Sequence, residues 1–191
     1  IRRGHFTEHD AAALTRDLVS GLNALHEHDI LHLDIKPENI LFDSMDEDAK
    51  VMITDFGLSK VFKGDQQGGN AQFSMKLMAE KLQTFLECGE TYKDQLRGTI
   101  GYMSPELILT GHVSKATDVF AAGVVLYILL CGRPPFNSKS NREVLEQTCR
   151  AAVALQIEHG NQLGIPWGVS ESGYNTLDAH FNYQYRAFGV P

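Results

Sequence analysis

Apolar residues recur at helical spacing near the start of the chain. Four leucines keep a spacing of three or four positions: Leu14, Leu18, Leu22 and Leu25. This spacing places them on one face of an α-helix. Thr7 precedes the run, and Asp10 lies three positions after Thr7. This spacing is typical of a capping box at a helix N-terminus. The pattern predicts a helix over about residues 8–28.

Two short apolar segments come next along the chain. They are "ENILF" (38–42) and "KVMITDFG" (50–57), and the acidic, turn-like stretch "DSMDEDA" lies between them. Short apolar runs that flank such a stretch are typical of a β-hairpin. We therefore expect a small hairpin whose two ends carry aspartate or asparagine side chains.

The remaining apolar segments favour helices. After a glycine- and amide-rich loop at 64–72, the stretch "FSMKLMAEKLQTFLEC" (73–88) keeps an approximate helical period. Three more helices are expected from "SPELIL" (104–109), "VFAAGVVLYILLC" (119–131) and "NREVLEQTC" (141–149). The run at 119–131 is shorter than the ~20 residues that span a bilayer. The pattern predicts a mainly α protein with one small β-hairpin.

Composition and charge narrow the possible partners. The chain has 191 residues, 43% of them hydrophobic and 21% charged, as is usual for a globular protein. A net charge of -7 with scattered basic residues makes nucleic acid and anionic membranes unexpected partners. Three separated cysteines without a CxxC spacing favour a reducing, cytoplasmic setting. With neither an initiator methionine nor a signal stretch, the sequence is expected to begin inside a domain.

Candidate chemistry gathers around the predicted hairpin. Asp34, Asn39 and Asp55 bring oxygen atoms of the kind that magnesium prefers as ligands. Lys36 adds a positive charge two positions after Asp34. Phosphoryl transfer uses this combination of an orienting carboxylate, metal ligands and a cation. Taken singly, each of these residues is more typical of a solvated turn.

Four motifs in order carry a family resemblance. They are "HLDIKPEN" (32–39), "DFG" (55–57), "GTIGYMSPE" (98–106) and "DVFAAGVVLY" (118–127). Together they resemble the C-terminal lobe of eukaryotic protein kinases, and the resemblance covers residues 1–149. The stretches "LLCGRPPF" and "SKSNREVLEQT" are similar to kinases of the calcium/calmodulin-dependent group.

The resemblance implies a protein-kinase-like C-lobe that is truncated. The family's glycine-rich loop, its nucleotide-contacting lysine and the glutamate that pairs with that lysine are not recognised in the sequence. The N-terminal lobe is therefore expected to be absent. The activation segment, 55–106, is long and is expected to carry an insertion at about 64–95.

The resemblance also implies site residues, with ATP and Mg²⁺ as cofactors and a protein as substrate. Asp34 would orient the substrate hydroxyl, Lys36 would face the γ-phosphate, and Thr99 with Lys36 matches the serine/threonine pattern. The cofactor-binding set is Lys36, Asn39, Asp55 and Gly57, of which Asn39 and Asp55 would hold the metal. A plain turn glycine is the alternative for Gly57.

Structural roles are implied for His32, Glu106 and Asp118. Asp118 would brace the catalytic loop, although an aspartate near a helix N-terminus is also favoured by the helix dipole. Leu33 departs from the family, which has an arginine here that pairs with a phosphorylated activation loop. His26 and His28 are two positions apart, so they do not share a helix face and no metal pair is expected.

The tail, residues 150–191, resembles a different family. "PWGVSES" and "YQYRAFGVP" are similar to a glucoamylase-like segment of bacterial cyclic β-glucan synthases. This resemblance implies a sugar site with Trp167 and Glu171, although aromatic core residues with polar neighbours are the alternative. Glycoside chemistry needs a second carboxyl group, which the tail does not clearly supply.

The sequence thus favours a protein serine/threonine kinase that transfers the ATP γ-phosphate to a protein hydroxyl. The fragment is expected to be inactive alone. Two alternatives remain open: a non-catalytic, pseudokinase-like binding module, and a fragment of a β-glucan-processing enzyme.

Overall fold

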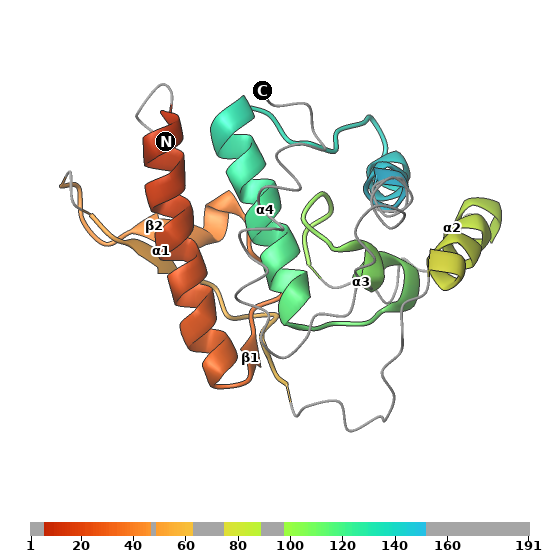
Figure 1. Cartoon of the computed structure of the whole chain (residues 1–191), viewed down its shortest axis with the longest axis horizontal. Coiled ribbons are helices and arrows are strands. Elements are labelled where there is room, and N and C mark those ends of the chain that lie inside the picture. Colours follow the sequence, from red (N-terminus) through yellow and green to blue (C-terminus); the bar gives the residue numbers. More distant parts are fainter. Residues whose placement is uncertain (1–5, 47–48, 63–74, 89–97, 152–191) are drawn as a thin grey trace. The chain divides into compact units, whose positions relative to one another are not determined.

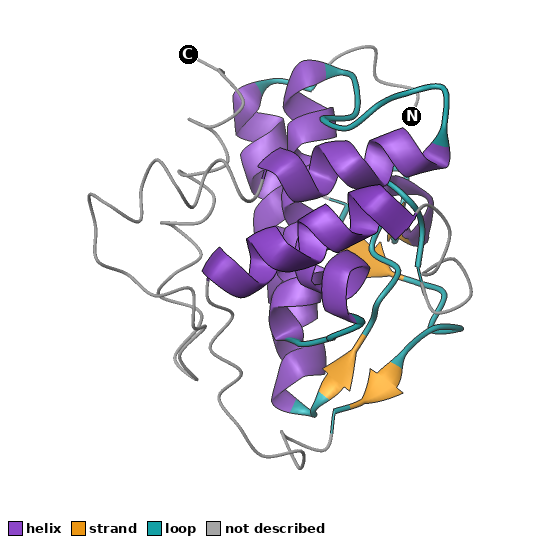
Figure 2. Cartoon of the chain, turned by 90° about the vertical axis from the view of Figure 1, so that its right-hand side faces the viewer, coloured by secondary structure: helices purple, strands orange, loops and turns teal. Residues whose placement is uncertain are grey.

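The computed structural model describes residues 6–46, 49–62, 75–88 and 98–151. These residues fall into two compact units, and each is described by itself. The first unit contains α1, η1, all four strands, residues 98–104 and α4, and the second contains α2, α3 and a helix over 141–151. The labelled elements run in the order α1 (Glu8–Glu27), β1 (Ile30–Leu31), η1 (Pro37–Asn39), β2 (Ile40–Phe42), β3 (Val51–Ile53), β4 (Lys60–Val61), α2 (Met75–Cys88), α3 (Pro105–Thr110) and α4 (Lys115–Cys131). Helices predominate over strands (Figure 2).

The capping box predicted at the start of α1 is confirmed. The Thr7 hydroxyl accepts a hydrogen bond from the Asp10 amide at 3.1 Å, and the Asp10 carboxylate accepts one from the Thr7 amide at 3.3 Å. This exchange satisfies two backbone donors that the first turn leaves without partners. Leu14, Leu18 and Leu22 lie on the buried face, as their spacing predicted.

Helix α4 starts earlier than its apolar run suggested. It begins at Lys115, after the N-cap residue Ser114, and includes the polar residues Thr117 and Asp118, both buried. The helix lies side by side with α1 (Figure 1). Between them lies the core of the first unit, whose most buried members are Leu18, Leu22, Ile35, Ala121, Ala122 and Val125. Ile35 belongs to the segment between β1 and η1, so this core anchors that segment.

The predicted hairpin is confirmed, and a second small sheet accompanies it. In the hairpin, β2 pairs antiparallel with β3, and Leu41 lies opposite Met52. In the other sheet, β1 pairs antiparallel with β4, and Ile30 lies opposite Val61. Strands of two residues carry too little alternation to be recognised in the sequence. The β1–β4 sheet brings the segments before and after residues 34–55 together.

The second unit is helical where it is described. Helix α2, which lies in the predicted insertion, packs against α3, and its Leu82 is buried. The Arg142 guanidinium donates to the Leu86 carbonyl oxygen at 2.7 Å. That carbonyl is among the last four of α2, which have no partner within the helix. The helix predicted over 73–88 is therefore present, as Met75–Cys88, and is bonded near its end.

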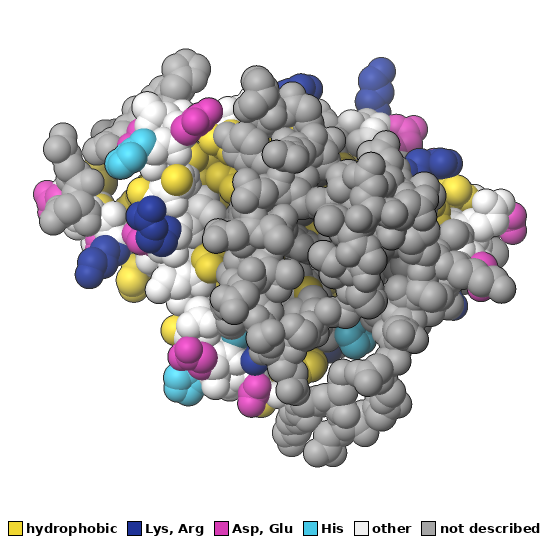
Figure 3. Space-filling model, viewed as in Figure 1, with side chains coloured by type: hydrophobic (Ala, Val, Ile, Leu, Met, Phe, Trp, Pro, Cys, Tyr) yellow, Lys and Arg dark blue, Asp and Glu magenta, His cyan; other side chains and the backbone are white. Residues whose placement is uncertain are grey.

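Within the described ranges, no helix is both long enough and apolar enough to cross a bilayer. On the face seen in Figure 3, the coloured positive and negative side chains are interspersed.

Candidate active site

The loop between β1 and η1 has an unusual backbone at Leu33. Its φ angle is 66°, in the left-handed region that a leucine rarely adopts. The side chain is only 6% exposed and is therefore packed in the interior. Such a conformation costs free energy and persists only where other contacts hold it.

A buried carboxylate from α4 holds this loop. Asp118 Oδ1 accepts a hydrogen bond from the Leu33 amide at 2.7 Å, and Oδ2 accepts one from the His32 amide at 2.9 Å. Asp118 is 1% exposed, so both bonds are shielded from water. The carboxylate thus bonds the loop directly, and an interaction with the helix dipole is not its main contact.

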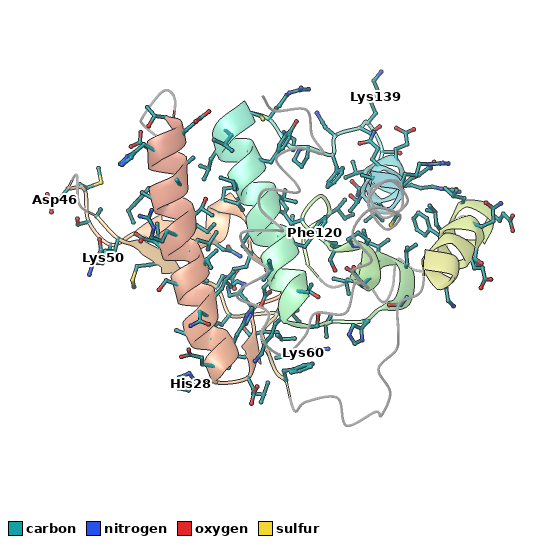
Figure 4. All side chains as sticks on the ribbon, in the orientation of Figure 1. His28, Asp46, Lys50, Lys60, Phe120 and Lys139 are labelled. Atoms are coloured by element: carbon teal, nitrogen blue, oxygen red, sulfur yellow. The ribbon has the colours of Figure 1, made fainter. Side chains whose placement is uncertain are left out.

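We expect Asp118→Ala to lower the free energy of unfolding by about 3–5 kcal/mol. The substitution leaves the buried His32 and Leu33 amides without their acceptor, and it removes the contact that holds the Leu33 backbone. Urea unfolding followed by circular dichroism measures this loss. Asp46→Ala is the control, because Asp46 is an exposed carboxylate near the tip of the β2–β3 hairpin (Figure 4). A loss equal to that of the control would contradict the bracing geometry.

Asp34 lies at the centre of a polar network. Its Oδ2 atom accepts a hydrogen bond from Lys36 Nζ at 2.6 Å, and its Oδ1 atom accepts one from the Thr99 hydroxyl at 2.6 Å. Lys36 Nζ also donates to Thr99 Oγ1 at 2.9 Å. The structure therefore brings Thr99 into contact with Lys36 and Asp34, which lie 63 and 65 positions before it in the sequence.

The network sets the charge of Asp34. Burial of the carboxyl opposes ionisation, but hydrogen bonds from Lys36 and Thr99 outweigh it and lower the pKa of Asp34 below its usual value. The hydrogen bond to Asp34 in turn raises the pKa of Lys36. Near neutral pH the pair is a carboxylate and an ammonium. A carboxylate with a lowered pKa is better suited to orienting a hydroxyl than to removing its proton early.

Asn39 bonds directly to this network, and the charge of Asp55 acts on Lys36. Asn39 is buried in η1, and its amide nitrogen donates to the Asp34 carbonyl oxygen at 2.9 Å and to Asp34 Oδ2 at 3.2 Å. Its side-chain oxygen is left for another partner, because an amide oxygen only accepts. Asp55 is exposed and has a φ angle of 62°.

The loop at "DFG" keeps one oxygen of Asp55 available. Gly57 donates its amide to Asp55 Oδ1 at 3.1 Å, and in the described part of the chain no bond to Oδ2 is found. A Cβ at Gly57 would lie 3.1 Å from Oδ1, so a side chain there would crowd the carboxylate. The glycine therefore shapes the position of Asp55 in addition to forming a turn.

His32 occupies a structural position. Its Nε2 atom is 3.0 Å from the Thr54 carbonyl oxygen, and its ring meets the Phe56 ring edge to face at 5.2 Å between centroids. The residue is fully buried. It links the loop of Asp34 to the segment of Asp55, and it is not placed to act on a substrate.

Gly98 brings the activation segment close to this loop. Its φ angle is 108°, and a Cβ at this position would lie 2.8 Å from the Leu33 carbonyl oxygen, which is backbone and cannot move aside. Only glycine fits such an approach. Thr99 follows directly, so this close contact helps to place its hydroxyl against Asp34.

We predict that activity does not depend on a phosphate docked beside Asp34, because Leu33 supplies a buried apolar side chain where the family has a guanidinium. Phosphatase treatment should leave kcat within about twofold, since docking needs a charge-assisted bond that leucine cannot make. Mass spectrometry of residues 56–104 before and after treatment checks that phosphate was removed. Lost activity that tracks dephosphorylation of this segment would contradict the prediction.

Glu106 belongs to the second unit, in the first turn of α3. Within the described ranges no arginine pairs with it.

Burial raises the pKa of the Cys149 thiol to about 12, and the charge of Glu106 adds to this rise. The thiol is therefore protonated and is no nucleophile at neutral pH.

The predicted sugar-site residues Trp167 and Glu171 lie outside the described residues. Among the residues that are described, no cluster of three or more His, Cys, Asp or Glu side chains could hold a metal ion. A magnesium site with two protein ligands remains compatible with this, because magnesium usually keeps waters and substrate phosphates as further ligands.

Comparison with known families decides the membership of the chain. A family model described as "Protein kinase domain" matches residues 1–184. The chain belongs to the protein kinase family.

Curated relatives agree with this membership. Calcium/calmodulin-dependent protein kinase type 1B of Homo sapiens is 38% identical over 152 residues, which are 80% of this chain and 37% of that protein. A calcium and calcium/calmodulin-dependent serine/threonine-protein kinase of Oryza sativa subsp. japonica is 38% identical over 82% of this chain and 25% of its own length. Calcium-dependent protein kinase 12 of Arabidopsis thaliana is 35% identical over 93% of this chain and 30% of its own length. The kinase chain thus spans between a quarter and two fifths of these relatives.

The match corrects the interpretation of the tail. It extends to residue 184 and so includes Trp167 and Glu171, and the resemblance to a β-glucan synthase segment is not supported. Aromatic and amide side chains occur in ordinary cores as well as in sugar sites, so their composition could not separate the two. The comparison likewise gives no support for limiting the kinase chain to a C-terminal lobe.

One residue of this kinase region was missed by the sequence analysis. His26, near the end of α1, lies 2.8 Å from Asp118 and is buried. A signal was available, because Leu14, Leu18, Leu22 and His26 are spaced by four and share the buried face. The histidine was compared only with His28 and not with that series.

Proposed function

We propose that this chain is the catalytic region of a protein serine/threonine kinase that transfers the γ-phosphate of ATP to a serine or threonine hydroxyl of a protein. One observation carries the proposal: Asp34 is held by Lys36 and Thr99 with short hydrogen bonds to both of its oxygens. A carboxylate fixed in this way has one defined direction in which to accept a further proton. Membership in the protein kinase family supports the same chemistry.

Asp34 would orient the substrate hydroxyl. It accepts a hydrogen bond from the hydroxyl, and it takes the proton as the hydroxyl oxygen bonds to phosphorus and the bond between phosphorus and the leaving ADP oxygen breaks. Because the pKa of Asp34 is lowered, this proton moves late in the reaction. Lys36, held as an ammonium, offsets charge on the transferred group. Thr99 bonds to both groups and holds the carboxylate and the ammonium in fixed relative positions.

Asn39 and Asp55 fit the role of magnesium ligands. Each offers an oxygen that makes no hydrogen bond within the described part of the chain, and hard cations prefer such ligands. Magnesium-bound ATP supplies the phosphoryl group and neutralises charge on its oxygens. The amide contacts of Asn39 with Asp34 would keep this candidate ligand in a fixed position relative to Asp34. Gly57 would keep Asp55 oriented.

The finer assignment rests on the relatives. We place the protein with the calcium/calmodulin-dependent group because relatives so named are 33–38% identical to this chain. The pair of Lys36 and Thr99 supports a serine or threonine substrate over tyrosine. A cytoplasmic location agrees with Cys131 and Cys149, which are free thiols.

Phosphate transfer by the protein that contains this chain is the direct test. The protein is incubated with γ-labelled ATP, Mg²⁺ and a mixture of serine-, threonine- and tyrosine-containing peptides, followed by phosphoamino acid analysis. Label on serine or threonine that disappears when EDTA removes the metal is the expected result. Binding of Mg²⁺·ATP without any transfer would overturn the proposal in favour of a pseudokinase-like binding module.

A further inference from the structure

A buried histidine extends the contacts that hold the catalytic loop. His26 Nε2 lies 2.8 Å from Asp118 Oδ2, and both residues are 1% exposed. A carboxylate can only accept, so the imidazole N–H is the donor. The contact joins the last turn of α1 to the first turn of α4, across 92 positions of the chain.

Both oxygens of Asp118 accept hydrogen bonds in this arrangement. Oδ1 accepts from the Leu33 amide, while Oδ2 accepts both from the His32 amide and from His26. The terminal torsion of an aspartate has a broad energy minimum, so amide contacts alone leave the carboxylate some rotation. The bond from His26 is a second donor on Oδ2 and the third on the carboxylate, and it restricts that rotation. The orientation of the carboxylate is therefore set by His26 as well as by the loop amides.

The position of Asp34 follows from that orientation. Leu33 precedes it directly and is held in the left-handed region by its bond to Asp118. A leucine leaves this region readily when its restraint weakens. Rotation of the carboxylate would therefore shift the backbone of the residue on which Asp34 depends.

We propose that His26 is a positioning residue for phosphoryl transfer: its Nε2–H fixes the Asp118 carboxylate, which fixes the backbone of His32 and Leu33 and thereby the direction of Asp34. His26 bonds to Asp118, so its effect on Asp34 would pass through that carboxylate. This inference rests on the proposed function of Asp34. It assigns a role to a residue that no motif contains.

The role requires a donor at the far end of a side chain of histidine length. Glutamine places an N–H at a similar reach, whereas leucine fills space without a donor. His26→Gln should therefore retain the function and His26→Leu should lose it. Two variants serve as controls. One tests the loss of any histidine near the end of α1, and the other tests a general loss of stability.

The first control is His28→Leu. His28 is exposed at the end of α1, points away from the helix pair in Figure 4, and contacts the Ala24 carbonyl oxygen. The second control is Leu14→Ala, which removes buried apolar volume from the same helix and so lowers stability without touching Asp118. Neither control should change kcat per folded molecule.

The experiment measures kcat, KM for ATP and hydrogen exchange of the His32 and Leu33 amides in the protein that contains this chain. For His26→Leu we expect kcat to fall by about tenfold to a hundredfold, with KM for ATP within about twofold and faster exchange at both amides. His26→Gln should restore kcat to within about threefold. Leu14→Ala should lower the melting temperature without these two changes.

Each outcome decides the proposal. Unchanged kcat and unchanged amide exchange in His26→Leu overturn it, as does a glutamine variant no better than leucine. An equal loss of kcat in Leu14→Ala also overturns it, because the effect would then be one of stability. If the wild-type protein transfers no phosphate, the proposed function fails separately. Amide exchange alone then decides whether His26 holds the loop: faster exchange that glutamine restores supports it, and unchanged exchange overturns it.

Discussion

Replacing Asp34 with asparagine is expected to lower kcat for protein phosphorylation by about 10²- to 10⁴-fold, the usual contribution of a positioned acid–base group. The substitution removes the acceptor charge. In the wild-type protein Lys36 Nζ lies 2.6 Å from Asp34 Oδ2. The asparagine would place an N–H donor toward this ammonium in place of a carboxylate oxygen. Steady-state kinetics with a peptide substrate measures the loss.

The affinity for Mg²⁺·ATP provides the internal check on Asp34→Asn. Asn39 and Asp55 keep their oxygens in this variant, so titration calorimetry should show nucleotide binding within about threefold of wild type. The matched control is Asp46→Asn, the same change at an exposed carboxylate. A variant that retained more than a tenth of wild-type kcat would show that Asp34 does not orient the nucleophile.

The second large effect is expected at Asp55, where the choice of substitution matters. Its φ angle of 62° is tolerated by asparagine but costs roughly 1–2 kcal/mol for alanine. Asp55→Asn therefore removes the ligand charge while keeping the backbone and the contact with the Gly57 amide. Because a metal ion contributes several kcal/mol to such reactions, we expect Mg²⁺-dependent ATP turnover to fall about a hundredfold or more.

Comparison of the two Asp55 variants separates chemistry from folding. Asp55→Ala and Asp55→Asn should lose turnover alike, whereas only Asp55→Ala should show a clearly lower melting temperature. A Mg²⁺ titration of initial rates and thermal unfolding by circular dichroism give the two quantities. Wild-type magnesium dependence in Asp55→Asn would remove Asp55 from the metal site.

Local signals in the sequence were sufficient for the larger elements. The spacing of leucines and the Thr7 cap gave α1, and apolar runs around an acidic turn gave the β2–β3 hairpin. Helix α4 was predicted four residues short, because its first turn is polar and the apolar run begins only at Val119. Ser114 is a typical N-cap residue, and it was the local signal for the earlier start of this helix.

The geometry of the site depends on contacts that local patterns do not encode. Leucine disfavours the left-handed region, so nothing at Leu33 itself predicts its φ angle of 66°. That angle depends on Asp118, which lies 85 positions later. The partner of His26 is also distant, 92 positions later, although its place in the buried series of α1 was a local signal. Motif resemblance pointed to the proposed site residues, and the fold shows what holds them.

The distance between Asp118 and the loop that it holds also has a consequence for biosynthesis. Residues 32 and 33 leave the ribosome 86 and 85 positions ahead of their acceptor. At about 5–20 residues per second, the loop waits roughly 4–17 s before α4 can supply that carboxylate. During this interval the nascent chain lacks the carboxylate that bonds the His32 and Leu33 amides. We therefore expect the loop of Asp34 to become ordered only after translation has passed well beyond the loop itself.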